Sequence, residues 1–316
     1  MKKKIVVLIY SLAFFACENI IYPELEPSLE LYVVDAWLNN LPGTQKIFVS
    51  KSSDYFSIAF PTLVSGAEVY VTDEDGNSFD FEESDEGYVW GDSLSSSFLQ
   101  VGTSYQLNVS INGIQFIGTS EMNPVPPIDS ITFQYQEEDF FTTEDYYLAE
   151  FVATDLIGVG NTYWIKAWKN GIYLNKPSEI NIAYDAGFSA GGNIDGQVFI
   201  QPIQELINPF DPDDADEALV EPPYLIGDTV YVEIHSINES AFYFLNEVKI
   251  QTDRQGGFGA LFAAPFSNVS TNLINEDSNS EIHPVGFFNV SSISSLEQVL
   301  TAEIAQKAQE EAENKN

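Results

Sequence analysis

The 316-residue chain is poor in the residue types that most often carry chemistry. It has one cysteine, two histidines and 12 Lys+Arg against 48 Asp+Glu, which gives a formal net charge of -36. A single cysteine excludes an internal disulfide. The excess of negative charge repels phosphate backbones and anionic membrane surfaces, so nucleic acid is not expected as a partner. Apolar residues make up 44% of the chain, which is too many for a disordered acidic protein.

Metal-binding and catalytic patterns are also scarce. The chain has no His-Glu-x-x-His pair and no phosphate-binding loop. Neither His235 nor His283 has a second strong ligand at a short fixed spacing, so we predict a structural role for both, with a metal or catalytic role as the alternative. With 48 acidic residues some carboxylates must lie close together, and such pairs do not by themselves indicate a glycosidase. We therefore expect a non-enzymatic protein without a cofactor.

The start of the chain has the pattern of an export signal. Lys2, Lys3 and Lys4 precede an apolar run that ends at Ala16 and is too short to span a bilayer. Cys17 follows directly, and residues 14–17 resemble the bacterial lipobox, with phenylalanine at 14 where leucine is usual. This pattern predicts a signal peptide at 1–16 and lipid attachment at Cys17. An ordinary cleaved signal or an uncleaved anchor is the alternative.

After a tether at 17–28, residues 29–123 have the pattern of a small β-sandwich. Apolar and polar residues alternate in short segments, which indicates strands with one buried and one solvated face. These segments lie at 29–38, 45–50, 67–72, 78–82, 88–90, 104–111 and 115–119. Turn residues at 39–43 and at Asn112-Gly113 predict hairpins between neighbouring strands. The number of short strands without a helical stretch favours a sandwich.

Residues 124–294 form the predicted second domain, which begins where prolines interrupt the strand pattern. Strand patterns return at 129–135, 147–153, 162–168 and 228–237. Asn170-Gly171 predicts a further tight turn. Apolar residues at helical spacing predict one helix over 239–250. The fold class is therefore mainly β, with two β-sandwich domains and a short helix in the second.

The tail at 295–316 changes character. Leu296, Leu300 and Ile304 lie four residues apart, as they do on one face of a helix. Ser295 with Gln298 three residues later resembles a capping box. We therefore predict a C-terminal helix that starts near Ser295.

Two further groups are candidate binding sites. The first is an acidic loop whose carboxylate oxygens are the ligand type that calcium prefers. Its carboxylates are Asp211, Asp213, Asp214 and Asp216. An EF-hand would need a ligand where Ala215 stands and a glycine where Asp216 stands, so a solvated loop is the favoured interpretation and a loose calcium site the alternative. The second group consists of five aromatic residues, Tyr88, Trp90, Trp164, Trp168 and Tyr224. They could stack on sugars, although aromatic residues at strand spacing more often build a core.

The order of several sequence blocks resembles that of a known family, the Bacteroidota lipoproteins described as domain of unknown function 4249. The blocks that carry the resemblance lie at 31–38, 64–73, 126–131, 227–234, 265–269 and 284–288. The resemblance implies Ig-like or transthyretin-like sandwiches, an outer-membrane location, and proximity to TonB-dependent receptors of the SusC type. It supplies no catalytic residues. The segment from Thr301 looks like an addition beyond the family's usual end.

Together these observations predict a non-enzymatic accessory or ligand-binding lipoprotein of the outer membrane, associated with a TonB-dependent uptake system. A polysaccharide-acting hydrolase and a structural adhesin are the alternatives. The weakly patterned region at 175–223 is where we expect a partner to bind, because long irregular segments on a β scaffold often carry recognition.

Substitution of Cys17 tests the proposed lipid attachment. We expect Cys17→Ala to move the protein from the membrane pellet to the soluble fraction, because several acyl chains hold a protein firmly and no other anchor is predicted. Cell fractionation and immunoblotting measure the change. Ser28→Ala, which alters only the tether, should stay in the pellet. A Cys17→Ala protein that remains in the pellet would contradict the prediction.

Overall fold

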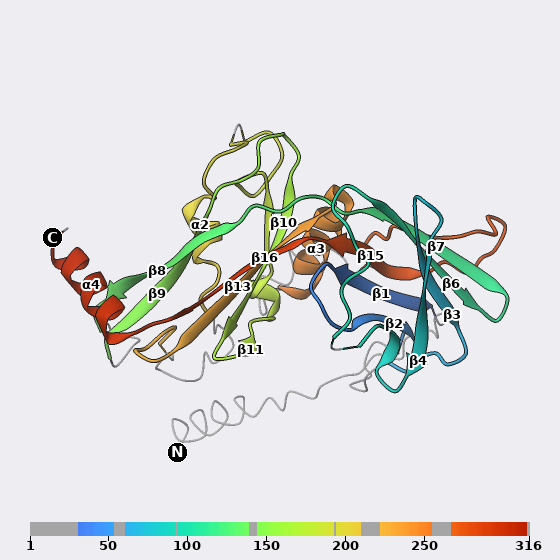
Figure 1. The fold of residues 1–316 in the computed structure, drawn as a ribbon, viewed down its shortest axis with the longest axis horizontal. Helices are drawn as coiled ribbons and strands as arrows, with labels where there is room; N and C mark the ends of the chain where they lie inside the picture. Colours follow the sequence, from blue (N-terminus) through green and yellow to red (C-terminus); the bar gives the residue numbers. More distant parts are fainter. Residues whose placement is uncertain are drawn as a thin grey trace, which may run out of the picture.

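The computed structural model describes residues 31–53, 61–92, 94–138, 144–192, 194–209, 222–254 and 267–314, and in these ranges the chain is mainly β (Figure 1). The strands are β1 Tyr32–Asn39, β2 Gln45–Lys51, β3 Glu68–Asp73, β4 Ser78–Ser84, β5 Gly87–Trp90, β6 Ser104–Ile111, β7 Ile114–Glu121, β8 Ile128–Gln136, β9 Tyr146–Ala153, β10 Thr162–Lys169, β11 Ile172–Tyr173, β12 Asn181–Tyr184, β13 Thr229–Ile237, β14 Leu273–Asn275, β15 Val285–Ser291 and β16 Ile293–Val299. The helices are the 3-10 turn η1 Pro177–Glu179 and the α-helices α2 Gln201–Glu205, α3 Glu239–Thr252 and α4 Ala302–Glu313. The predicted mainly β class, with a helix in the second half and a C-terminal helix, is confirmed.

The first sheet has nine strands in the order β14-β7-β6-β3-β4-β5-β2-β1-β15. It curls until its two ends approach one another. Asn272, beside β14, donates to the Phe288 carbonyl of β15 at 2.7 Å and accepts from the Phe288 amide at 3.0 Å. Alternate strand residues fill the enclosed core, among them Val34, Ala36, Ile47, Val49, Val71, Leu107, Val109 and Phe116. These side chains point into the core because successive side chains of a strand point to opposite faces.

Two of the predicted tight turns have the backbone that their sequences require. Asn112 and Gly113, between β6 and β7, have φ of 51° and 82°, and Asn170 and Gly171, between β10 and β11, have φ of 51° and 79°. Two positive φ angles define the turn that matches the twist of a hairpin, and Asn-Gly adopts it with little strain. Both predicted hairpins are confirmed.

The second half of the chain packs a five-stranded sheet against the β8–β9 hairpin. The sheet has the order β11-β10-β13-β16, and β12 pairs with residues 162–165 of β10 on the same edge as β11. Their shared core includes Phe133, Phe151, Tyr163, Ile165, Val232 and Ile234. Helix α4 closes this core through Ala305 and Ala308. Only one face of the five-stranded sheet is used in this way, so its other face is left for different contacts.

One segment belongs to both sheets. β15 pairs in parallel with β1 of the first sheet, and β16 pairs antiparallel with β13 of the second. Ser292 alone separates β15 from β16. In Figure 1 the red segment at 285–299 accordingly runs from one sheet into the other. The predicted division between 29–123 and 124–294 is therefore not a division between sheets, because β14 and β15 return to the first sheet.

Helix α3, predicted from its spacing and confirmed, covers the junction of the sheets. Phe242 and Leu245 of α3 pack with Ile182 of β12 and Phe287 of β15. A polar network lies beside this small core. Asn238, which precedes α3, donates through Nδ2 to Ser120 Oγ at 2.5 Å and to Asn289 Oδ1 at 3.2 Å. These side-chain bonds tie α3 to both ends of the first sheet.

The C-terminal helix begins later than predicted. Residues 295–299 are part of β16, and the helix starts at Ala302 with Thr301 as its N-cap. The Thr301 hydroxyl accepts the Ile304 amide at 3.3 Å. The capping-box interpretation of Ser295 was wrong because seven residues of β16 pair with β13, and this long-range pairing outweighs the local helical spacing. No helix within the described ranges is long and apolar enough to cross a membrane.

Gly286 allows β15 to pair with β1. Its φ is +99°, and a Cβ built there would lie 2.1 Å from the Val34 carbonyl oxygen. Gly227 is a matched control, because its φ is +103° and nothing lies within 4 Å of its built Cβ. We expect Gly227→Ala to cost about 1–2 kcal/mol from backbone strain and Gly286→Ala to cost at least about 3 kcal/mol. Urea unfolding measures both. Equal losses of unfolding free energy in the two variants would show that the close contact with Val34 does not limit the pairing of β15 with β1.

Candidate functional site

The predicted lipid and calcium residues cannot be placed. Cys17 lies outside the described residues, as do Asp211, Asp213, Asp214 and Asp216. Both interpretations stay predictions.

The two histidines lie in different environments. His283 is exposed in the loop before β15, whereas His235 lies in β13 and is 6% exposed. The His235 Nε2 lies 2.7 Å from Glu233 Oε2, and the Tyr231 hydroxyl donates to Glu233 Oε1 at 2.8 Å. Burial, reinforced by the positive charge of Lys166, lowers the pKa of His235 to about 4. The ring is therefore neutral at pH 7 and donates to Glu233, which is a structural arrangement.

The five aromatics named as a stacking group do not form one platform. Tyr88 is 2% exposed in the core of the first sheet and Tyr224 is 0% exposed in the core of the second. Trp90 packs against the first core, and Trp164 packs against the junction core beneath α3. The alternative interpretation of these four as core residues is thus the correct one. Trp168 belongs to none of the described cores.

A Gly-x-Ser-x-Gly match at 187–191 was missed by the sequence arguments. In hydrolases this motif lies on a sharp turn from a strand into a helix. Here it lies in a loop after β12, and Gly187 closes a short turn by pairing with Tyr184. Ser189 is exposed, and the next helix along the described residues, α2, begins only at Gln201. The local structure therefore lacks the strand-turn-helix context of a nucleophile elbow.

Three carboxylates converge beside the second core. One oxygen each of Asp155, Asp185 and Asp195 lies within 4.8 Å of the others, and the first two residues are each 4% exposed. Asp155 accepts from the Tyr163 hydroxyl at 2.6 Å, and Asp185 accepts from two backbone amides. Burial raises the pKa of Asp155, and the two neighbouring carboxylates raise it further. Among the described residues, this cluster has the oxygen donors with which a divalent cation could be held.

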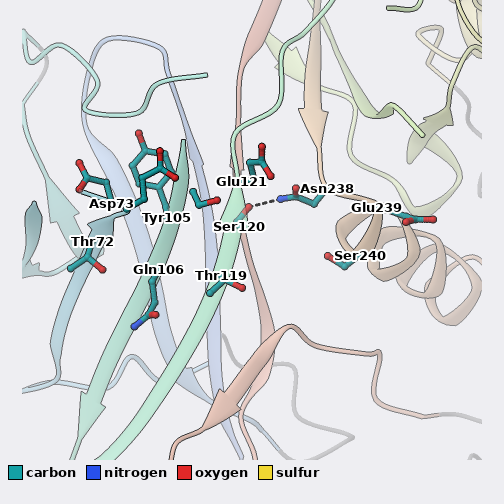
Figure 2. Close-up of a pocket in the computed structure, with 12 residues that line it drawn as sticks. Thr72, Asp73, Tyr105, Gln106, Thr119, Ser120, Glu121, Asn238, Glu239 and Ser240 are labelled. Carbon is teal, nitrogen blue, oxygen red and sulfur yellow. Dashed lines mark hydrogen bonds between the residues drawn. The ribbon is translucent and has the colours of Figure 1, made fainter. Parts of the chain in front are cut away.

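An acidic groove of about 740 Å³ opens between the first sheet and α3 (Figure 2). It is lined by Thr72, Asp73, Glu74, Ser104, Tyr105, Gln106, Thr119, Ser120, Glu121, Asn238, Glu239 and Ser240. Its floor contains the Ser120–Asn238 hydrogen bond, and its acidic side chains come from β3, the following turn, β7 and α3. The sequence could not reveal this groove, because its walls come from four segments far apart in the chain.

The charge of the groove limits what it can bind. Its lining includes four carboxylates, and none of the described residues that line it is lysine or arginine. A hydrogen bond from the Asn77 side chain lowers the pKa of Asp73, which keeps that carboxyl charged. Such a surface attracts basic groups and repels anions. The groove therefore suits a cationic ligand or a basic segment of another protein.

The fold and these sites define a mainly β protein whose two sheets share one segment. The chain belongs to the family described as Domain of unknown function (DUF4249), whose model matches residues 18–297. The family region thus starts directly after Cys17 and ends before α4. A search of curated proteins found no match to the chain.

The environment of His235 predicts a specific pH dependence of stability. Its pKa is about 4 in the fold against 6.5 for an unperturbed histidine, so the unfolded chain takes up a proton first as the pH falls. A lowered folded-state pKa stabilises the fold above pH 6.5, and this contribution of up to about 3 kcal/mol is lost between pH 6.5 and 4. We expect His235→Gln to reduce the loss of unfolding free energy between pH 7 and 4.5, measured with urea.

His283→Gln is the control, because His283 is exposed and its removal should leave the pH dependence unchanged. If the His235→Gln protein loses as much stability as the wild type over the same range, His235 is not the group responsible.

Proposed function

We propose that this protein is a lipid-anchored, non-enzymatic accessory or ligand-binding subunit of the outer membrane that works with a TonB-dependent receptor. The observation that carries this proposal is the order of its segments. Three lysines and an apolar run precede Cys17, and the family region begins at the next residue. A signal, a site for lipid and then a folded region is the order expected of an exported lipoprotein.

The site geometry supports binding as the function. The acidic groove is large enough for a side-chain cluster of a partner, since ligand sites commonly measure about 300–1,000 Å³. His235 is held by Glu233 inside the protein, away from any substrate in solution. The His235–Glu233 pair thus serves the fold, while the groove offers an open polar surface for contacts.

A lipid anchor would add to the strength of such contacts. Confinement to a membrane raises the effective concentration of two partners, so a weak docking contact suffices to keep them together. In this proposal a basic segment of the receptor would face the acidic groove. Charge complementarity would then speed encounter and fix the orientation of the two proteins.

Co-purification tests the proposal. Gently solubilised from its native membrane, the tagged protein should recover a TonB-dependent receptor, identified by mass spectrometry. We expect Glu74→Lys with Glu121→Lys to reduce the recovery at least about fivefold, because both exposed carboxylates line the groove. Glu82→Lys with Glu281→Lys makes the same change of charge at exposed positions outside the groove and should have little effect.

Deletion of residues 211–217 should also weaken the association if this acidic loop takes part in it. Recovery of the protein alone, while a known receptor complex survives in the same extract, would contradict the accessory role. Turnover of a polysaccharide or peptide by the purified protein would instead show that the protein is a hydrolase.

A further inference from the structure

Three aromatic side chains lie in a row on the outer face of the second sheet. Trp168 of β10 is directly opposite Tyr173 of β11 on one side and Tyr231 of β13 on the other. The Trp168 ring centroid lies 4.9 Å from that of Tyr173 and 5.2 Å from that of Tyr231, with the planes tilted by 32° and 53°. All three belong to none of the described hydrophobic cores. Core packing therefore does not account for the row.

The face that carries the row is partly exposed. In β16 the residues opposite Tyr231 and Glu233 are Glu297 and Ser295, and both are exposed. Glu233 and His235 of the same face are buried, and helix α3 and its core cover the end of the face at Trp164. The three rings are each half-buried. They form an aromatic strip that ends beside the exposed Glu297.

Polar groups border the aromatic strip at the next register position. Lys166 lies directly opposite Glu233, and its Nζ lies 3.8 Å from the centroid of the Trp164 ring. Among the described residues no hydrogen bond or ion pair reaches this Nζ, which contacts the face of the Trp164 ring. Asp35 of β1 is close enough for its charge to act on Lys166, and its side chain is exposed.

We infer that this face binds a neutral carbohydrate chain, with Tyr173, Trp168 and Tyr231 stacking on sugar rings. Lys166 would donate to sugar hydroxyls, and Asp35 would accept from them. The inference rests on the proposed binding function and deepens it by naming the class of ligand.

The combination of groups favours a neutral sugar over other ligands. A sugar ring has an apolar C–H face, which is attracted to the negative face of an aromatic ring, and an edge of hydroxyls, which need both donors and acceptors. Anionic ligands would be repelled by Asp35, Glu233 and the overall charge of the protein, whereas a neutral hydroxyl-rich ligand can use both the donor Lys166 and the acceptor Asp35.

Direct binding tests the inference. The full chain, purified in detergent, is titrated with neutral hexasaccharides of glucose, mannose, xylose and N-acetylglucosamine by calorimetry, with tryptophan fluorescence as a second readout. We expect at least one to bind. Trp168→Ala should weaken that binding about tenfold or more through loss of stacking. Lys166→Gln should weaken it as well.

Tyr243→Ala is the matched control, because Tyr243 is an exposed aromatic on α3, 46% exposed and outside the strip. It should bind as the wild type does. Urea unfolding of each variant shows whether the fold persists; because Trp168 lies outside the cores, we expect little loss. Tyr173→Ala, which removes the neighbouring ring on β11, provides a second variant if Trp168→Ala fails to fold.

The inference is overturned if none of these sugars binds at millimolar concentration, if only charged sugars or peptides bind, or if neither Trp168→Ala nor Tyr173→Ala weakens sugar binding. A protein that still recovers its receptor from membranes but binds no neutral sugar would disprove the carbohydrate face and leave the accessory function standing. The two failures are therefore distinguishable.

Discussion

The parallel pairing of β1 with β15 is the interaction on which the rest of the structure depends. It brings residues 285–291 back to a strand formed by residues 32–39, and it covers an edge of β1 that would otherwise be free to pair with other chains. Because β16 follows after one residue and belongs to the second sheet, the same pairing fixes the two sheets to each other. Such a distant contact has a high cost in loop entropy, so the first sheet is complete only when the end of the chain has docked.

The joint between the sheets, where β15 passes through Ser292 into β16, contains polar as well as apolar contacts. Asn289 is fully buried, and its side chain accepts from Asn238 and donates to the Ser291 hydroxyl. The Ser292 hydroxyl donates to the Asn123 carbonyl, so the segment that enters the second half is held where β15 passes into β16. Buried polar groups of this kind are costly unless every partner is in place, and they therefore select one arrangement. The joint specifies the geometry, while the cores supply most of the stability.

Local chemistry was predictable from the sequence, and distant pairing was not. The turns at Asn112-Gly113 and Asn170-Gly171 are correct because two residues determine them. At Ser295 the helical spacing of Leu296 and Leu300 was misleading, because Leu296 also alternates correctly for a strand and packs against the second core. The groove and the aromatic strip combine residues from several strands, which only the register brings together. Trp168 was named as a stacking residue, but its true neighbours were not.

If Cys17 carries a lipid, as we propose, the length of the segment after it limits how far these surfaces can lie from the membrane. β1 begins at Tyr32, fifteen residues after Cys17, and a fully extended chain of that length spans at most about 50 Å. A lipid on Cys17 would thus keep β1, and with it the joint, close to the bilayer. The groove is bounded by α3, which covers the junction of the sheets, and the aromatic strip lies on β10, β11 and β13 of the second sheet, which β16 connects to β15. A partner held at the groove and a ligand held at the strip would consequently keep a fixed relative position. The proposed accessory subunit would need this fixed relative position to present a ligand to a membrane receptor, whereas a hydrolase that releases its product would not.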